Sequence, residues 1–583
     1  MAKSILLNTK YGYPIFATII CCFSFSLTFG LFGLGLFEAF INLILLMPVF
    51  GVFLVTFRSY CISVILASLS AFIIHYIDWY VYSQRLTHIR LSDFSQIDQA
   101  IRVADRYSIL WDIDNTKTLF FVIILCLIFV FVTVHYHVKQ PKKPVVLHGM
   151  LSVLVSLVLF FSGAFPKEAE SFDFTADTES NGLMYSWYCQ YHGKKGIRPE
   201  GYSKDLANGI LSRHSNAEGH TDVDVIVIMN ESLTDYSQIG LTDYSDPLIN
   251  IHRYDKNYFY GKLAVSVYGG GTANTEYEFL TGNSLSFLPE GAIPYLQYII
   301  DDRDSIAQEM EDLGYITQAI HPYYSEEWNR TQVYNYLGFD SFISGIDFGN
   351  TVATNGMRAT TVPSQNLISF GDGPLYVRGL ISDQSCLERV LEELTDNMFI
   401  FTVTMQNHGD YEYVGDDFVN TSYISEDDDS AYSINQYLTC THLSDAAFKM
   451  FTDKLESRAR KTIVLMFGDH QPALLRIKNH IQIEQTDKVI YYDVPYILWA
   501  NYDLEFDAPA YTSPNYLSAI LKKNAGLPLT PWDQFRLDMM EKYPVVTTNF
   551  ILDKKGNHIK AEDMNEYAIV QYMRMFDSDG QGE

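Results

Sequence analysis

Long apolar segments fill the first 165 residues, and they constrain the fold more than any other feature of the sequence. The segment from Pro14 to Phe57 is 44 residues long and carries one charge, at Glu38. About 20 apolar residues span a bilayer, so this segment is long enough for two helices. Three more apolar runs follow, at residues 59–82, 118–134 and 145–165. A signal peptide has only one short run, so we expect a five-helix membrane domain over residues 1–165 rather than a leader and buried core helices.

Lysines and arginines beside these runs predict the orientation of the domain. They precede the first run, separate the second from the third, and separate the fourth from the fifth: Lys3, Lys10, Arg58, Lys139, Lys142 and Lys143. With five helices all of them lie on one side, which should be the cytoplasm. The N-terminus is then cytoplasmic and the chain after Phe165 is outside. Residues 85–116, also outside, mix charged and apolar side chains, which favours an interfacial helix over a solvated loop.

The rest of the chain has a different charge. Residues 1–165 contain 11 Lys and Arg against 7 Asp and Glu, whereas residues 166–583 contain 30 against 62. The formal net charge of −28 excludes a general nucleic-acid-binding protein, because phosphate backbones require a basic surface. Only Cys189, Cys386 and Cys440 follow the apolar runs, which excludes a disulfide-built scaffold.

After a polar linker at residues 166–221, the segment 222–583 has the pattern of one α/β domain. Helical patterns occur at Asp304–Leu313, Gln384–Leu394 and Ser444–Ser457. They alternate with strands, which predicts a sheet covered by helices on both faces. The predicted strands are short, mostly β-branched runs: Val223–Met229, Leu263–Val267, Met398–Met405, Thr462–Phe467 and Val494–Trp499.

Two of these strands are followed at once by residues that can bind a metal. Glu231 comes soon after the first strand, and Asp469 and His470 after the fourth. Functional groups gather beyond the carboxyl ends of the strands in open α/β sheets. Two carboxylates and an imidazole suit Mn²⁺, Mg²⁺ or Zn²⁺. Each residue alone has a plainer interpretation as a helix cap, surface or core residue, and their convergence favours a metal site.

Thr272 is the candidate nucleophile. Three glycines precede it, which allows a tight turn that presents the hydroxyl at a helix N-terminus, where phosphate is stabilised. Metal coordination would lower the pKa of this weak nucleophile. The alternative is a glycine-rich turn with a threonine cap, which does not exclude a nucleophile at the same position.

Five motifs in order resemble the lipoteichoic acid synthase family of phosphoglycerol transferases, which belongs to the alkaline phosphatase/sulfatase superfamily. The resemblance runs from about residue 222 to about residue 530 and extends to the five-helix N-terminal domain. The motifs are VIMNES with Glu231, GGGTANTEYEFLTGNS with Thr272, Trp328-Asn329-Arg330, Gln406-Asn407-His408-Gly409 and Gly468-Asp469-His470. The resemblance implies an extracellular sulfatase-like catalytic domain on the membrane of a Gram-positive bacterium.

The resemblance also implies roles for individual residues. Glu231, Thr272, Asp469 and His470 would bind one metal, Mn²⁺ in this family, with Thr272 as the nucleophile. The substrate-binding residues would be His321, Trp328, Arg330 and His408. Without the resemblance, Trp328 reads as a core residue and His321 as a surface loop residue. The donor would be phosphatidylglycerol and the acceptor lipoteichoic acid, a glycolipid or another glycan.

Two departures from the family pattern concern the acceptor. Tyr323 stands where family members often carry a polar or acidic residue, and Gly269–Gly271 replace the Gly-Lys of some polymerising synthases. They favour decoration of a glycan or glycolipid over synthesis of a long polymer. The alternatives are a phosphoethanolamine transferase of the same superfamily and a non-catalytic membrane receptor with a degenerate phosphatase fold. A sulfatase is disfavoured because Thr272 lacks the C/S-x-P-x-R context.

Overall fold

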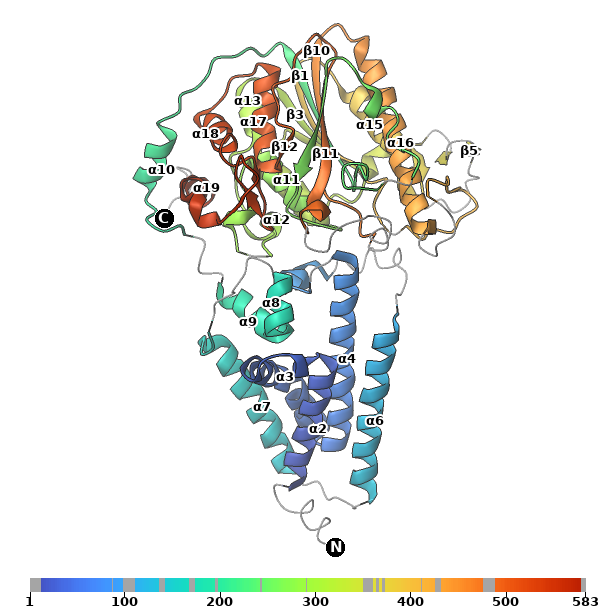
Figure 1. The fold of residues 1–583 in the computed structure, drawn as a ribbon, viewed down its shortest axis with the longest axis vertical. Coiled ribbons are helices and arrows are strands. Elements are labelled where there is room, and N and C mark those ends of the chain that lie inside the picture. The colour runs from blue at the N-terminus through green and yellow to red at the C-terminus, as the bar shows by residue number, and fades with distance from the viewer. Residues whose placement is uncertain are drawn as a thin grey trace. The chain divides into compact units, whose positions relative to one another are not determined.

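The computed structural model describes residues 12–85, 88–97, 111–135, 142–166, 174–193, 198–241, 244–289, 291–349, 360–362, 366–369, 373–409, 411–424, 431–474 and 488–577. The chain forms two compact units (Figure 1). Of the described residues, the first unit contains those up to residue 193, and the second contains those from residue 198 onward.

Apolar helices make up most of the first unit. Four of those described are long and apolar enough to cross a membrane: α3 (Leu36–Phe57), α4 (Tyr60–Arg85), α6 (Ile113–His135) and α7 (Lys142–Ser162). The remaining apolar helix, α2 (Gly12–Thr28), has 17 residues, and the residues before it lie outside the described part. Four apolar helices of spanning length are therefore confirmed among the described residues of the N-terminal region, and the fifth span stays a prediction.

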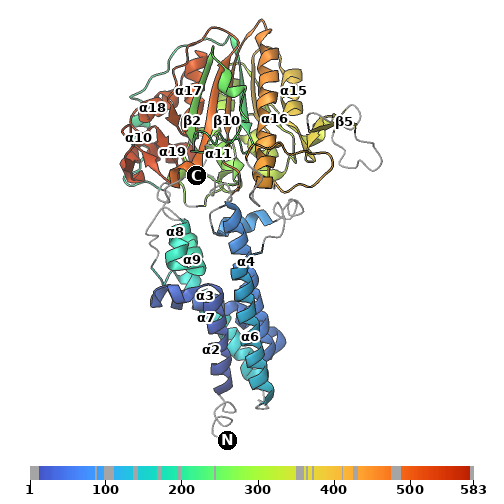
Figure 2. The same ribbon diagram turned by 45° about the vertical axis from the view of Figure 1, so that its right-hand side comes forward.

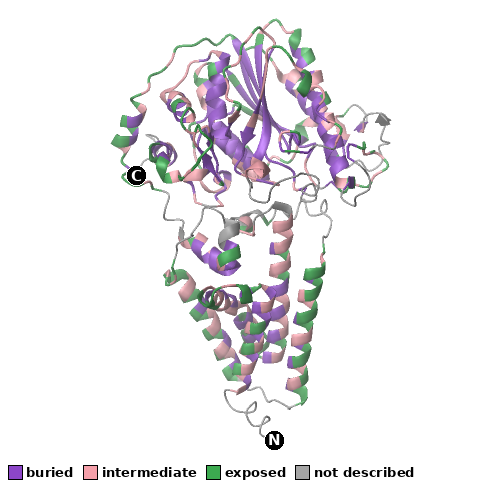
Figure 3. Ribbon diagram, in the orientation of Figure 1, coloured by how far each residue is buried: buried purple, intermediate pink, exposed green. Residues whose placement is uncertain are grey.

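Glycines bring α3 and α7 into close contact. A Cβ atom on Gly51 would lie 2.7 Å from the carbonyl oxygen of Gly149, and one on Gly149 would lie 2.6 Å from that of Gly51. Small residues at such crossings let helix backbones approach within a membrane. Large apolar side chains such as Phe131 on α6 and Leu154 on α7 are exposed instead, as lipid-facing residues are. Figure 3 shows exposed residues, in green, along these helices.

The segment predicted as a linker contains helices. α8 (Phe174–Asn181) and α9 (Leu183–Gly193) belong to the first unit, and α10 (Lys204–Leu211) to the second. The Asn42 side chain on α3 fastens the junction of α8 and α9 by donating to the Asn181 carbonyl oxygen at 2.6 Å. The predicted interfacial helix near residues 85–116 lies largely outside the described residues. Between the end of α4 and the start of α6, these contain the short η2 (Leu91–Gln96).

An eight-stranded sheet forms the centre of the second unit (Figure 2). Five neighbouring strands are parallel, whereas β11 runs antiparallel to both β10 and β2. The order is β12 (Tyr511–Thr512), β2 (Tyr258–Ala264), β11 (Asp493–Ala500), β10 (Lys461–Gly468), β1 (Val223–Asn230), β9 (Met398–Val403), β3 (Ile316–His321) and β4 (Ser341–Ser344).

Helices cover both faces of this sheet, as predicted. On one face Ile226 and Ile228 pack with α15 (Asp383–Glu393) and α16 (Ala431–Glu456). On the other face Val225 and Val227 pack against the remaining helices. These include α11 (Thr272–Thr281), α13 (Ile306–Asp312), α17 (Pro514–Ala525), α18 (Pro531–Met540) and α19 (Asn565–Phe576).

Shorter elements complete the unit. The helices α12 (Pro294–Gln297) and α14 (Arg330–Tyr336) follow α11 along the chain. A four-stranded sheet contains β5 (Thr360–Val362), β6 (Leu367–Ser369), β7 (Leu375–Val377) and β8 (Leu380–Ile381). A three-stranded sheet contains β13 (Val545–Val546), β14 (Ile551–Leu552) and β15 (His558–Ile559). None of these strands is predicted from the sequence.

The predicted strands match β1, β9, β10 and β11, and the prediction at Leu263–Val267 is wrong in its bounds. β2 spans Tyr258–Ala264 and begins with half-buried aromatic residues, so an apolar run marks only its end. The predicted helix at Ser444–Ser457 is the second half of α16, whose first half buries polar side chains such as Asn435 and Gln436.

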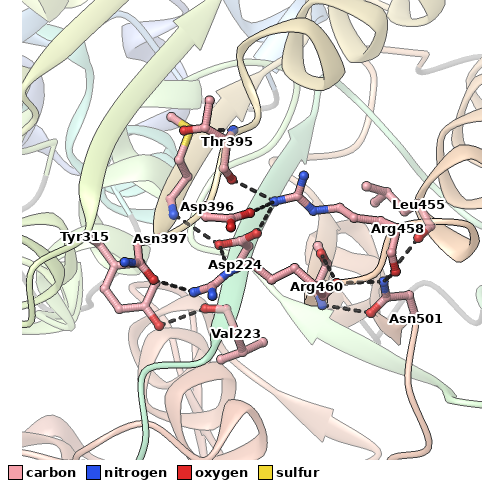
Figure 4. A network of polar contacts seen from close by, with 12 residues as sticks. Val223, Asp224, Tyr315, Thr395, Asp396, Asn397, Leu455, Arg458, Arg460 and Asn501 are labelled. Carbon is pink, nitrogen blue, oxygen red and sulfur yellow. Dashed lines mark hydrogen bonds and ion pairs between the residues drawn. The ribbon is translucent and has the colours of Figure 1, made fainter.

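A polar network joins the strands at the sheet end opposite Glu231 (Figure 4). Asp224, near the start of β1, is fully buried and pairs with both Arg458 and Arg460. Its Oδ1 atom also accepts from the Met398 backbone N–H of β9 at 3.2 Å. The network thus ties β1 to the neighbouring strand and to the loop before β10.

Candidate active site

The register of two parallel strands places the carboxylates side by side. β1 pairs with β10 so that Asn230 lies opposite Gly468. Glu231 follows the last residue of β1 and Asp469 follows the last residue of β10. The two carboxylates therefore lie side by side at the same edge of the sheet. The Ser232 N–H, at a left-handed φ of 53°, donates to Asp469 Oδ1 at 2.7 Å and fixes the two loops together.

Glu231, Asp469 and His470 form a buried cluster with one ligand atom of each within 4.8 Å of the others. His470 Nδ1 lies 2.9 Å from the Gln471 carbonyl oxygen, to which only a protonated nitrogen can donate. Its other nitrogen, Nε2, then carries a lone pair and faces Asp469 Oδ2 at 3.2 Å and Glu231 Oε1 at 3.7 Å. This convergence of electron-rich atoms suits a cation bound between them.

The electrostatics of Glu231 and Asp469 fit a divalent cation. Burial and then the adjacent Asp469 carboxylate raise the pKa of Glu231 well above its usual range. Asp469 Oδ2 is buried and accepts no hydrogen bond from the described residues, whereas Oδ1 accepts from two backbone N–H groups. Two carboxylates with one imidazole are ligands of Mn²⁺, Mg²⁺ and Zn²⁺ alike, so the donor set fits a cation without selecting one.

Thr272 begins helix α11, directly beside this cluster. The three preceding glycines have φ values of 66°, 149° and 90°, which side chains rarely adopt. This turn brings the Thr272 hydroxyl to 3.5 Å from Glu231 Oε2. One helical turn further, the Thr275 hydroxyl donates to the Asp469 carbonyl oxygen at 2.8 Å, which holds α11 against the cluster of Glu231, Asp469 and His470. The structure thus brings Thr272 together with Glu231, Asp469 and His470 at the N-terminus of α11, and their roles as nucleophile and metal ligands stay predictions.

Arg330 approaches the cluster from helix α14. It is 2% exposed and pairs with the fully buried Glu276, with Nη2 at 2.6 Å and Nε at 3.1 Å from Glu276 Oε1. The positive charge of Arg330 lowers the pKa of Glu231, against the larger effect of burial, and also lowers the pKa of His321. The residue predicted to grip phosphate therefore lies in the site, already held by an internal carboxylate.

His321 ends strand β3 and is buried, so the alternative of a surface loop residue is wrong. Its Nδ1 lies 3.0 Å from the Val403 carbonyl oxygen and donates to it, which leaves Nε2 as an acceptor. Nε2 is buried and has no partner among the described residues. Burial, and then Arg330, lower the pKa of His321 well below its usual value, so the imidazole is neutral. Its Nε2 atom can accept a hydrogen bond from a hydroxyl group.

Trp328 and Asn329 occupy a strained turn before Arg330. Both have left-handed backbone conformations, with φ of 56° and 59°. Such conformations in residues other than glycine cluster at functional sites. Trp328 is half-buried and packs against the edge of the main core, consistent with its alternative interpretation as a core residue. The turn sets the direction in which Arg330 begins α14.

The motif around His408 is anchored by a buried polar network. The Asn407 amide donates to Asn230 Oδ1 at 3.2 Å and to Ser444 Oγ at 2.9 Å. Asp383, at the start of α15, accepts from Asn230 at 2.8 Å and from Ser444 at 2.6 Å. Through Asn230, the residue before Glu231, this network joins the His408 loop to the metal cluster.

Neither Glu276 nor Asp383 is predicted as a functional residue. Both are acidic residues in the first turn or two of a helix, where carboxylates normally serve as solvated caps. What distinguishes Glu276 and Asp383 from ordinary helix caps is their complete burial, which can be seen only in the folded structure.

Comparison with known proteins places this fold. The Sulfatase family matches residues 224–522. A Rhizobium meliloti (strain 1021) protein, to which modification of cyclic beta-1,2-glucan is ascribed, is 28% identical over 433 residues, 69% of this chain and 63% of that protein. Lipoteichoic acid synthase 1 of Bacillus subtilis (strain 168) is 21% identical over 207 residues, 34% of this chain and 28% of its own length. The chain thus spans less than two thirds of these relatives.

A solved structure shares the fold of the second unit. The Streptococcus pyogenes phosphoglycerol transferase GacH, in complex with sn-glycerol-1-phosphate, superposes with a TM-score of 0.52 at 19% identity. The match covers 64% of this chain and 94% of the GacH chain. At this sequence identity the superposition shows that the second unit has the same α/β fold as GacH.

Proposed function

Since this chain belongs to the sulfatase family, within the alkaline phosphatase superfamily, we propose that it is a membrane-anchored phosphoglycerol transferase. It moves glycerol phosphate from phosphatidylglycerol to a cell-envelope acceptor. The observation that carries the proposal is the Thr272 hydroxyl, 3.5 Å from Glu231 at a helix N-terminus and beside a buried three-ligand cluster. A nucleophilic hydroxyl in this position suits transfer through a covalent intermediate.

Glu231, Asp469, His470 and the Thr272 hydroxyl would hold one divalent cation, Mn²⁺ by family resemblance, with Mg²⁺ and Zn²⁺ as alternatives. When bound, the cation lowers the pKa of the Thr272 hydroxyl and offsets negative charge on the phosphoryl oxygens. The ligand set itself is proposed from the geometry of the cluster.

In the first step Thr272 Oγ1 attacks the phosphorus of phosphatidylglycerol. Its proton passes to Glu231 Oε2, toward which the hydroxyl already points. The bond between phosphorus and the diacylglycerol oxygen breaks, and His408 protonates the leaving oxygen. Arg330, fixed by Glu276, donates to a phosphoryl oxygen. The product is diacylglycerol and a glycerophosphoryl group on Thr272.

In the second step a hydroxyl of the acceptor attacks the same phosphorus. His321 Nε2 takes the proton of this hydroxyl, because Nδ1 is committed to the Val403 carbonyl and Nε2 carries the lone pair. The bond between phosphorus and Thr272 Oγ1 breaks, and the proton held by Glu231 returns to the threonine. The proton on His321 then passes through water to His408, which restores both imidazoles for the next cycle. Trp328 forms a wall of the glycerol site.

We place the second unit outside the cell membrane, with the N-terminus in the cytoplasm, as the flanking lysines and arginines indicate. The donor then comes from the outer leaflet. The relative to which cyclic glucan modification is ascribed supports a glycan acceptor. We propose single transfers to a glycan or glycolipid rather than synthesis of a long polymer. Tyr323 and the glycines before Thr272 favour the same interpretation.

Donor choice tests the proposal. Full-length protein in detergent is incubated with labelled phosphatidylglycerol or phosphatidylethanolamine, with and without Mn²⁺, beside Thr272→Ala. We expect Mn²⁺-dependent release of diacylglycerol from phosphatidylglycerol that the variant lacks. Release from phosphatidylethanolamine alone would favour the phosphoethanolamine transferase, and absence of Mn²⁺ binding would favour the receptor.

A further inference from the structure

An arginine occupies a turn position that normally suits asparagine or glycine. β7 and β8 pair as a hairpin in which Val377 lies opposite Leu380, leaving Arg378 and Gly379 as a two-residue loop. Their φ values are 51° and 77°, both positive, as a type I′ turn requires. Asn-Gly is the preferred sequence for this turn, and a long side chain at the first position is strained. The side chain must therefore compensate through its contacts.

The Arg378 side chain reaches the loop that carries His408. It is 7% exposed, and its Nη2 atom donates to the carbonyl oxygens of Gln406 at 3.1 Å and His408 at 2.9 Å. The guanidinium carbon also lies 5.2 Å from the centre of the Tyr411 ring, and the Tyr411 hydroxyl donates to the Asn407 carbonyl oxygen at 2.6 Å. Arg378 and Tyr411 together thus bind three consecutive carbonyl groups.

We propose that Arg378 is a positioning residue that fixes the backbone at His408 for transfer chemistry. The proposal rests on the proposed function, since it concerns the residue that protonates the leaving group. The side-chain amides of Gln406 and Asn407 already hold this loop by donating hydrogen bonds to the Ser444 hydroxyl on α16. The hydrogen bond from Arg378 to the His408 carbonyl holds the loop from the side of the small sheet. Displacement by about 1 Å in such a group can cost about a hundredfold in rate.

The turn chemistry supplies a variant that separates folding from function. Arg378→Asn creates the preferred Asn-Gly turn, so the hairpin should stay intact, yet it removes the guanidinium from both carbonyl groups. Arg378→Lys keeps the charge and the strained turn but offers a single donor centre in place of the planar fork. The proposal predicts that Arg378→Asn is the more stable of the two variants and the less active.

Two measurements on the full-length protein in detergent test the proposal. In a double-mutant cycle, Arg378→Asn should lower the turnover number for diacylglycerol release by about tenfold to a hundredfold, the usual effect of a supporting residue. In a His408→Ala background it should cost less than twofold, because both changes act through one group. Equal losses in the two backgrounds would contradict the proposal, as would wild-type turnover in Arg378→Asn.

Hydrogen exchange gives an answer that does not depend on the donor. The backbone amides of the described residues 404–409 should exchange faster in Arg378→Asn than in wild type, while the midpoint of thermal unfolding and the Mn²⁺ affinity stay unchanged. Unchanged exchange in this segment would overturn the proposal even if the protein used another phospholipid. Faster exchange in a protein that does not cleave phosphatidylglycerol would instead reject only the proposed donor.

Discussion

The carboxylate of Glu276 binds the guanidinium of Arg330 inside the protein, one helical turn after the candidate nucleophile. The two side chains are 0% and 2% exposed, and Arg330 Nη2 lies 2.6 Å from Glu276 Oε1. The hydroxyls of Tyr334 and Tyr295 donate to the other oxygen, Oε2, at 2.7 and 3.2 Å. Because Glu276 and Thr272 share helix α11, the pair fixes the distance between the phosphate-binding arginine and the nucleophile.

Breaking this pair should affect stability and activity in different ways. Glu276→Ala leaves a buried guanidinium without its carboxylate, which costs about 3 to 5 kcal/mol of unfolding free energy. The double variant Glu276→Leu with Arg330→Met replaces both charges and should recover most of that stability but not the activity. Thermal unfolding and diacylglycerol release on the same preparations check both expectations. A double variant as active as wild type would exclude a role for Arg330 in binding phosphate.

The Asp224 network should serve stability alone. Asp224→Asn leaves Arg458 and Arg460 without their shared buried carboxylate, at the sheet end remote from Glu231 (Figure 4). Because both arginines are 21% exposed, we expect about 3 kcal/mol of destabilisation, the low end for a buried pair. The Mn²⁺ affinity and the turnover per folded molecule should be those of wild type, and a drop in Mn²⁺ affinity would show that the two sheet ends are coupled.

The ion pairs of His252 with Asp235 and Asp246 predict how the stability of the fold depends on pH. His252 lies 3.2 Å from the buried Asp235 and 2.8 Å from Asp246. The hydrogen bond to Asp235, ahead of the other causes, raises the pKa of His252 to about 9. A raised pKa stabilises the folded protein fully below the unfolded pKa of about 6.5, and this contribution disappears as the pH rises through about 9.

The variant His252→Gln should therefore lower the midpoint of thermal unfolding at pH 6 and leave it nearly unchanged at pH 9.5. His558→Gln, at an exposed histidine on β15, is the matched control and should shift neither midpoint. Equal destabilisation by His252→Gln at both pH values would mean that the packing of the ring, rather than its charge, stabilises the fold.

The strands that the sequence predicts best are those buried on both faces. β1, β9 and β10 are each dominated by buried apolar residues, and the residues that follow β1 and β10 are the metal-binding candidates. β3 escapes prediction because it buries Thr317 and Gln318 beside apolar residues and so forms no apolar run. Polar side chains in such a strand are stabilised by partners that only the fold supplies.

The same limit applies to the site. Glu231, Asp469 and His470 are predictable because adjacent strands bring their carboxyl ends together. The partner of Arg330 is not, because Glu276 is 54 residues away and reads locally as the first turn of a helix. Arg378 is hidden further, because its hairpin is short and its contacts with the His408 loop depend on two separate sheets.

Covalent labelling of Thr272 tests the central claim most directly. The full-length protein is incubated with phosphatidylglycerol and Mn²⁺ without an acceptor, quenched in acid and digested for peptide mass spectrometry. Water is then the only hydroxyl that can clear the intermediate. The variant His321→Gln should therefore enrich the intermediate, because it lacks the base of the second step, and Thr272→Ala is the control. We predict one glycerophosphoryl group on Thr272 in wild type and more in His321→Gln. Release of diacylglycerol at the wild-type rate from Thr272→Ala, or a modified residue elsewhere, would contradict the account.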